Sequence, residues 1–228
     1  MLYDLHLHTC LSPCANDDMT PASVVGMAKL AGAELVAITD HNSALNLPAA
    51  AAACAAYGLR LLPGIEVNTA EEIHLLTYFP TVAAALQMSQ ALYDTLPDFA
   101  YDNTIWGQQT VCNENDEPLA TVPRLLTNAA AMNIYEAKAL CERLGGIAVP
   151  AHADKDSYSL LAVLGFCPDD LAFEAFELHA EGAYANLCET RRLPQNKEIL
   201  LSSDAHCLAD IAKRLQPLSP HSVLQRLL

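Results

Sequence analysis

Histidine, aspartate and glutamate recur in short motifs along the whole chain of 228 residues. His6 and His8 form the first motif, Asp204 and His206 form the last, and one residue separates the two side chains in both pairs. Other imidazole and carboxylate groups lie in motifs between these two: Asp40, His41, Glu66, His74 and His152. Imidazole nitrogens and carboxylate oxygens are the ligands that hydrolytic metal sites use. The motifs therefore predict a centre of divalent metal ions that activates water.

A lone buried histidine is often a hydrogen-bonded core residue, and each motif taken singly fits that interpretation about as well as metal binding. Six of the chain's eight histidines, however, fall in these motifs. Without a cation, so many imidazoles and carboxylates packed side by side would leave several groups unpaired, which is costly in a protein interior. We therefore expect the motifs to meet at one metal centre.

The elements that must position these side chains are short strands. Apolar and β-branched runs predict strands at 2–7, 34–39, 59–67, 73–79, 146–151, 172–178 and 198–203, and helices are expected at 20–30, 47–57, 81–92 and 134–144. Residues i and i+2 of a strand face the same side, so His6 and His8 can bind one metal while Leu5 and Leu7 pack behind them. The alternation favours a parallel sheet, open or closed into a barrel, with the active site at the carboxyl ends of its strands.

Residues from about 95 to 133 interrupt this alternation with turn-forming residues. Proline, asparagine and aspartate are frequent here, and the periodicity of the flanking segments is lost. We predict an insertion that covers one face of the barrel, with a hairpin around Asn115 and Asp116.

The composition is typical of an enzyme with one sizeable core, since hydrophobic residues make up 52% and charged residues 17% of the chain. No run of about 18 apolar residues predicts a membrane helix. The N-terminus lacks a secretory pattern and the eight cysteines contain no CxxC pair, so we expect reduced thiols in a cytoplasmic protein. Cys10 and Cys14 follow the first motif, but nitrogen and oxygen ligands suit a hydrolytic site better than thiolates.

The net charge of −15 bears on the binding partners. Tight, non-specific binding to nucleic acid needs clustered lysine and arginine, so it is not expected here. A small phosphorylated substrate is compatible with this charge, because bound divalent cations would reverse the local potential. The sequence leaves the oligomeric state open.

Taken together, the motifs resemble those of the PHP (polymerase and histidinol phosphatase) domain family. The matching segments, in the order of the family, are DLHLHT at 4–9, ITDHN at 38–42, GIEVN at 64–68, IHLL at 73–76, PAHAD at 150–154 and SSDAH at 202–206. The resemblance covers nearly the whole chain and implies a single domain at 1–228, folded as a distorted (βα)7 barrel with parallel strands. It is closest to the small stand-alone phosphoesterases of the family, which include nucleotide and oligonucleotide 5′-phosphate hydrolases.

The resemblance also implies a ligand set for two or three divalent ions of zinc, manganese or iron. The first metal would be held by His6, His8, Glu66 and Asp204. Glu66 would bridge to a second metal, which His74 and His152 also bind. The third would be held by His41, His206 and an acidic residue of the loop after the first strand, for which we choose Asp17, with Asp18 as the alternative.

The expected reaction is hydrolysis of a phosphate ester by metal-activated water. Asp204 could carry the proton for the leaving group, whereas Asp40 either orients an imidazole or is a turn residue. Lys155 and Ser43 are the nearest candidates for binding the phosphate, and His179 could line the pocket. Two alternatives are an amidohydrolase that cleaves C–N bonds and a metal-binding scaffold domain without activity.

Overall fold

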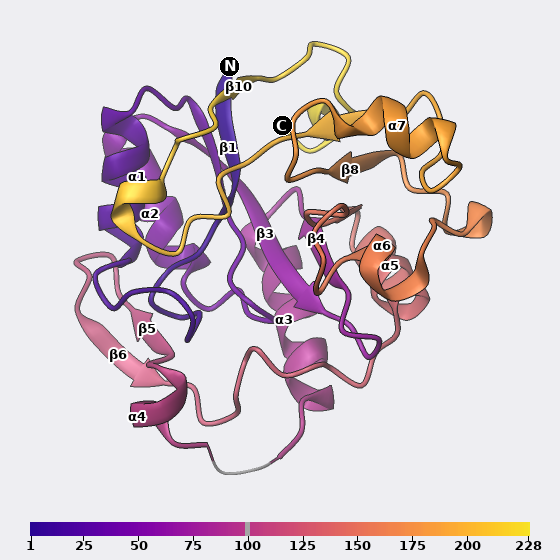
Figure 1. Cartoon of the computed structure of the whole chain (residues 1–228). Helices are drawn as coiled ribbons and strands as arrows, with labels where there is room; N and C mark the ends of the chain where they lie inside the picture. Colours follow the sequence, from indigo (N-terminus) through magenta and orange to yellow (C-terminus); the bar gives the residue numbers. More distant parts are fainter. Residues whose placement is uncertain (99–100) are drawn as a thin grey trace.

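The computed structural model describes residues 1–98 and 101–228, which form a mixed sheet surrounded by helices (Figure 1). Strands β1 (Leu2–Leu7), β2 (Leu35–Ile38) and β3 (Arg60–Asn68) run parallel to one another. β4 (His74–Tyr78) is antiparallel to both β3 and β7 (Ile147–Pro150). The short β10 (Gln216–Pro217) pairs with β1 and brings the C-terminal segment beside the N-terminus.

The sheet curls into a half-barrel because the later strands return towards β1. β8 (Ala175–Glu177) runs parallel to β9 (Glu198–Leu200). The N–H of Ala153 donates to the carbonyl of Glu177 at 2.8 Å, which links the segment after β7 to β8. The N–H of His8 donates to the carbonyl of Ala205 at 3.1 Å, which places the segment after β9 beside the end of β1.

The expectation of parallel strands throughout is wrong at β4. Only residues 69–73 connect β3 to β4, and the N–H of Thr69 donates to the carbonyl of Ile73 at 3.0 Å within this turn. A connection between parallel strands needs roughly a dozen residues or more, so the short turn forces antiparallel pairing. The reversal places His74 at the start of β4, opposite Asn68 at the end of β3.

Within the described ranges, buried side chains form two clusters on opposite faces of the sheet. Val36 of β2 belongs to the cluster beneath the helices, and Leu35 belongs to the cluster on the inner face. In β1, Leu5 lies in the inner cluster but Leu7 lies beneath the helices. The register of β1 against β2 shifts by one residue between Asp4 and Leu7, which explains the change of face. Leu5 and Leu7 therefore do not pack together behind the two histidines, contrary to expectation.

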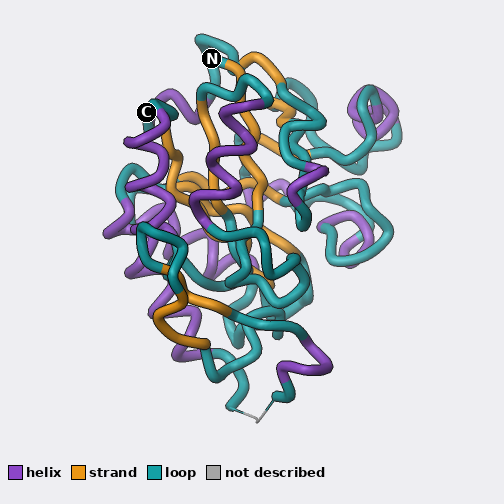
Figure 2. The backbone as a smooth tube through the Cα atoms, turned by 90° about the vertical axis from the view of Figure 1, so that its left-hand side faces the viewer, coloured by secondary structure: helices purple, strands orange, loops and turns teal. Residues whose placement is uncertain are grey.

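Helices enclose the strands on several sides (Figure 2). α1 (Pro21–Leu30) begins with a proline after Thr20, as the sequence predicts, and packs against α2 (Leu47–Tyr57). The remaining helices outside the inserted segment are α3 (Val82–Thr95), α5 (Ile134–Arg143), α6 (Leu160–Leu164) and α7 (Ala183–Glu189), with 3₁₀ turns at Asp169–Leu171, Leu208–Asp210 and Val223–Arg226. Among the described residues, no helix is long and apolar enough to cross a membrane.

The inserted segment contains α4 (Asn103–Trp106) and a hairpin of β5 (Thr110–Cys112) and β6 (Pro118–Thr121), at the lower edge of Figure 1. The hairpin expected around Asn115 and Asp116 is present, while Phe99 and Ala100 of the expected insertion lie outside the described residues. The hairpin turn also caps α1. One oxygen of Asp116 accepts from the N–H of Ala22 at 2.9 Å, and the other accepts from the hydroxyl of Thr20 at 2.5 Å.

This contact predicts that Asp116 stabilises the fold. A carboxylate at a helix N-terminus contributes roughly 0.3–1 kcal/mol, so Asp116→Asn should lower the free energy of unfolding by about that amount. For a chain of this length the melting temperature should fall by roughly 1–4 °C, measured by circular dichroism. Glu114→Gln is the matched control, because it removes the same charge from an exposed position in the same turn. Equal melting temperatures for the two variants would show that Asp116 does not act as a cap.

Candidate metal centre

Glu66 in β3 is buried and lies among five imidazole rings. Its Oε1 lies 2.9 Å from His74 Nδ1, 3.2 Å from His152 Nε2 and 3.3 Å from His6 Nε2. Its Oε2 lies 3.2 Å from both His8 Nε2 and His41 Nδ1. Six of the side chains that the sequence assigns to the metal centre therefore surround a single point.

The strand ends explain why these side chains meet. His6 and His8 come from the end of β1, and Glu66 comes from the carboxyl-terminal half of β3. His41 follows β2 and is bridged to Glu66. Because β4 runs in the opposite direction, its first residue, His74, reaches the same edge of the sheet as the last residues of its parallel neighbours.

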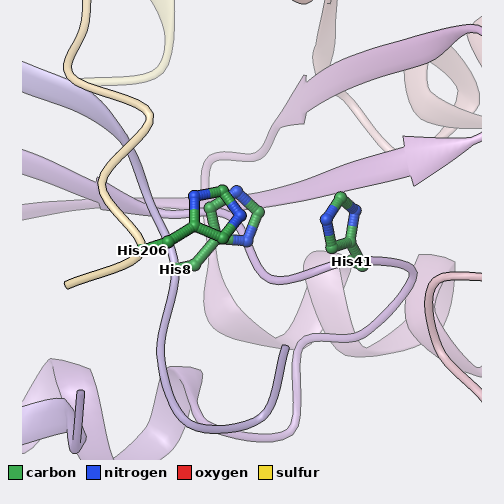
Figure 3. A group of neighbouring side chains, drawn as sticks. All are labelled: His8, His41 and His206. Atoms are coloured by element: carbon green, nitrogen blue, oxygen red, sulfur yellow. The ribbon is translucent and has the colours of Figure 1, made fainter. Parts of the chain in front are cut away.

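The C-terminal motif completes the cluster. Asp204 Oδ1 lies 3.3 Å from His6 Nε2 and 3.5 Å from His8 Nε2. The ring of His206 stacks on that of His8 with the centroids 4.1 Å apart, and the ring of His41 lies beside this pair with its centroid 4.7 Å from that of His8 (Figure 3). The structure thus brings together residues from opposite ends of the chain. Among the described residues, three groups of side chains are close enough to hold a metal ion, namely His6, His8 and Glu66; His41, Glu66 and His74; and His8, His41 and His206.

Two of the residues at this centre have strained backbones. His152 has a φ of 29° and Asp204 a φ of 53°, in the left-handed region that residues other than glycine seldom adopt. Such conformations persist where the surrounding structure fixes them, and they concentrate at functional sites. The strain is consistent with a functional cluster at the mouth of the half-barrel.

A second layer of side chains holds the imidazoles in place. Both oxygens of Glu177 approach His6 Nδ1, at 2.9 and 3.1 Å, and one of them also accepts from the N–H of His152 at 2.9 Å. His8 Nδ1 lies 3.0 Å from the hydroxyl of Ser12, which donates to Asp40 at 2.7 Å. Partners of this kind fix the orientation and tautomer of metal-binding imidazoles.

The sequence did not single out Glu177 or Ser12. The signal in the sequence for Glu177 is an acidic residue that ends a buried strand, whereas the predicted pocket residue in this segment, His179, is exposed. Asp40 contacts Thr9 and Ser12 rather than an imidazole, so it orients His8 only through Ser12. Its catalytic role stays a prediction.

The structure places the remaining candidates as follows. Lys155 Nζ donates to Asp204 Oδ2 at 2.6 Å, so it lies beside the centre. Ser43 is buried, and its hydroxyl accepts from the N–H of Leu45 at 3.4 Å within a turn. Asp17 and Asp18 are both exposed and belong to none of the three groups, so the choice between them as a ligand stays a prediction.

Comparison with known proteins places this geometry in a family. A sequence profile of the PHP domain matches residues 4–167. The chain belongs to the PHP domain family. That membership classes it with metal-dependent hydrolases that act on phosphoester bonds. A stretch of 76 residues is 37% identical to part of the 5′-3′ exoribonuclease Rnm of Salmonella typhimurium. The aligned stretch makes up 32% of this chain and 25% of that protein.

Solved structures share the fold of this PHP domain at low sequence identity. The lesion-specific endonuclease Q of Pyrococcus furiosus is 19% identical with a TM-score of 0.61, and the alignment covers 91% of this chain but 48% of that one. A protein from Bifidobacterium adolescentis assigned as a metal-dependent phosphoesterase is 19% identical with a TM-score of 0.60, and the alignment covers 90% of this chain and 87% of that one. An amidohydrolase from Chromobacterium violaceum is 21% identical with a TM-score of 0.61, and the alignment covers 96% of this chain and 92% of that one.

The charges within the PHP domain favour a bound cation. Burial alone would raise the pKa of the Glu66 carboxyl, but the imidazoles of His74, His6 and His41 hold this pKa well below its usual value. Burial also opposes ionisation of Asp204, yet His6 and His8 hold its pKa well below the usual range. Burial opposes protonation of His8, but the neighbouring carboxylates of Asp204 and Glu66 raise its pKa to about 9. The carboxylates of Glu66 and Asp204 are thus ionised, and their negative charge favours a bound cation in the cluster.

The donor atoms also fit a metal. The ring nitrogens that face Glu66 on His6, His8, His41 and His74 are buried and have no good hydrogen-bond partner among the described residues. A buried polar atom left in this state is costly unless an ion or ligand satisfies it. Imidazole nitrogens with carboxylate oxygens suit zinc, manganese or iron.

Glu177 should therefore be needed for tight metal binding although it is not one of the expected ligands. Glu177→Gln keeps the shape of the side chain but removes the charge that orients His6. Loss of such a partner weakens metal affinity roughly 10–100-fold. The affinity can be measured by competition with a chromogenic chelator, and Glu189→Gln on the exposed face of α7 is the control. Unchanged affinity in Glu177→Gln would mean that His6 is not a ligand or needs no orientation.

Proposed function

We propose that the protein is a metal-dependent phosphoesterase. It hydrolyses a phosphate ester of a small metabolite, a nucleotide or a short 5′-phosphorylated oligonucleotide at a site of two or three divalent ions. The observation that carries this proposal is the buried Glu66 carboxylate with five imidazoles within 3.3 Å of its oxygens. No set of hydrogen bonds among these groups satisfies all of them, whereas shared cations do.

The proposed ligands follow from these contacts. His6, His8, Glu66 and Asp204 would hold the first ion. Glu66, His74 and His152 would hold the second, and His41 and His206, with Asp17 or Asp18, would hold the third. Divalent ions bound there supply acidified water at neutral pH and neutralise the charge of the phosphoryl oxygens.

Side chains of the protein would carry the proton between the attacking water and the leaving group, and would bind the phosphate of the substrate. Asp204, which Lys155, His6 and His8 keep ionised, accepts a proton from the attacking water at Oδ1 and returns it to the leaving oxygen. Lys155 is half-buried and holds Asp204 Oδ2, so its ammonium group lies beside the proposed ions, where it would attract an entering phosphate. Glu177 and Ser12 keep the imidazoles of His6 and His8 in one orientation while this happens.

Nucleic acid belongs in the proposed substrate range. Rnm is named as an exoribonuclease, and an endonuclease Q with the same fold has been solved with a 27-mer DNA duplex. The expectation from net charge that nucleic acid is not bound tightly finds no support in these relatives. The chain spans about a quarter of the length of Rnm and about half that of endonuclease Q, so their substrates are only a guide.

We further infer that β1, β2, β3, β4, β7, β8 and β9 form one distorted seven-stranded barrel within a single domain at 1–228. The bonds from Ala153 to Glu177 and from His8 to Ala205 support this closure. Residues 95–133 would then be an insertion at the mouth of the barrel. A cytoplasmic location stays a prediction from the sequence.

The proposal predicts phosphate release that depends on His8. The manganese- or zinc-loaded protein should hydrolyse at least one of p-nitrophenyl phosphate, nucleoside phosphates and 5′-phosphorylated oligonucleotides. His8→Ala should lower the rate by roughly a hundredfold or more, because it removes a proposed ligand of the first ion. His221→Ala, which removes an exposed imidazole elsewhere, should leave the rate unchanged. Bound metal without turnover of any ester would favour a scaffold, and turnover of amides alone would favour an amidohydrolase.

A further inference from the structure

Asp4 is a buried carboxylate to which the proposed reaction gives no role. It lies in β1, two residues before His6, and its side chain is 0% exposed. Its two oxygens accept from two backbone N–H groups: Oδ1 from Ser203 at 3.0 Å and Oδ2 from Ala212 at 2.9 Å. Burial of a carboxylate is costly unless hydrogen bonds compensate it. These two bonds therefore indicate what Asp4 does in the fold.

The two bonds join β1 to both ends of one loop, residues 203–212. Two proposed metal ligands, Asp204 and His206, lie within this loop. The loop passes the end of β1 and continues to α1, against which its 3₁₀ turn Leu208–Asp210 packs (Figure 1). A single side chain of β1 thus closes the loop that carries the last two ligands of the centre.

The bond at the start of the loop fixes the backbone of Asp204. Asp4 holds the N–H of the residue directly before it. On the other side, the N–H of Ala205 donates to the carbonyl of His6 at 3.3 Å, and its carbonyl accepts from the N–H of His8 at 3.1 Å. Asp204 is thereby kept at its φ of 53°, with Oδ1 3.3 Å from His6 Nε2. A left-handed conformation of this kind persists only where neighbouring contacts fix it.

The bond at the end of the loop fixes a second left-handed residue. Ala212 has a φ of 59°, and its N–H points to Asp4. Between the two ends, His206 Nδ1 lies 2.9 Å from the carbonyl of Asp204, and the carbonyl of His206 accepts from the N–H of Asn16 at 2.9 Å. The bond at Ala212 thus limits where the segment that follows His206 can run.

We propose that Asp4 is a positioning residue for the metal centre. It holds the 203–212 loop so that Asp204 and His206 stay within reach of the ions. The inference rests on the proposed phosphoesterase function and adds a residue that this function requires, although it contacts neither the ions nor the substrate. Both oxygens are needed, because the two N–H groups lie at opposite ends of the loop. Side chains that support metal ligands in this way determine how well the site is formed.

The isosteric variant Asp4→Asn tests the role of the second oxygen. An amide has the same shape but a single acceptor, so one N–H of the loop would face the Nδ2 donor and lose its partner. One end of the loop should then be released. We expect metal affinity to fall roughly 10–100-fold, as when the partner of a ligand is lost. His206→Ala, which removes a proposed ligand of the same loop, gives the reference for this loss.

A pair of variants at Ala212 changes the loop and leaves the buried carboxylate intact. Ala212→Val places a β-branched residue at a φ of 59°, where it is strained, and should displace the N–H from Asp4. Ala212→Gly adopts this φ readily and keeps the N–H, so it is the matched control. Ala212→Val should weaken metal binding as Asp4→Asn does, and Ala212→Gly should not.

The visible absorption of bound Co²⁺ reports the positions of the ligands without turnover, because it depends on the number and geometry of the ligand atoms. Spectra and metal content would be measured below the melting temperature of the least stable variant. Asp4→Asn and Ala212→Val should change the spectrum and lower the metal content. Asn133→Ala, which removes the N-cap of α5, lowers stability far along the chain from the loop and should change neither.

The outcomes separate the positioning role from a purely structural one. Lower melting temperatures of Asp4→Asn and Ala212→Val with an unchanged Co²⁺ spectrum and metal content would overturn the inference. If Asp4→Asn does not fold, the comparison of Ala212→Val with Ala212→Gly decides, and equal spectra would overturn it. Loss of metal in His206→Ala but not in Asp4→Asn would count against Asp4 alone. An unchanged spectrum in His206→Ala would count against the proposed ligand set and hence against the proposed function.

Discussion

The burial of one ionised carboxylate governs this structure. Glu66 is 1% exposed, and a carboxylate in that position needs compensating positive charge. The groups that can provide it, or can hold cations that do, come from β1, β4 and the segments after β2, β7 and β9. Most strands of the half-barrel therefore end at this carboxylate. The strained backbones of His152 and Asp204 are tolerated because both residues are fixed from several sides.

The motifs were sufficient to predict that six histidines, Glu66 and Asp204 lie close together, because the residue types of a metal site can be recognised whatever the direction of the strands. The family resemblance assigned His74 to the centre in a sheet that was expected to be parallel, and His74 reaches the centre from a reversed strand. The five-residue connection before it was visible in the sequence, but the regular alternation of strands and helices outweighed it. Membership in the PHP family follows from the same motifs. The direction of β4 and the register shift in β1 depend on pairing with neighbours, which periodicity alone does not report.

The supporting side chains were harder to predict for a physical reason. Glu177 contacts His6 across 171 positions of the chain, and this contact depends on the register of β8 relative to β1. Ser12 belongs to no recognisable motif, and the sequence left Asp40 with two possible roles. The contact through Ser12 that connects Asp40 to His8 depends on the conformation of the loop after β1. The acidic residues of that loop pose the same problem. Asp17 and Asp18 have equivalent side chains, and only the path of the chain around them could distinguish them.

The inserted segment packs against the loop after β1, and the same loop supports His8. The N–H of Thr110 donates to the carbonyl of Cys10 at 2.9 Å, and a Cβ at Gly107 would lie 2.0 Å from the carbonyl of Pro13. The insertion is therefore packed tightly against the loop that carries Ser12, the partner of His8. A displacement of α4 would be transmitted along this loop to the imidazole. Sequence changes in the insertion that move its contacts with Cys10 and Pro13 would therefore also shift the loop that supports His8.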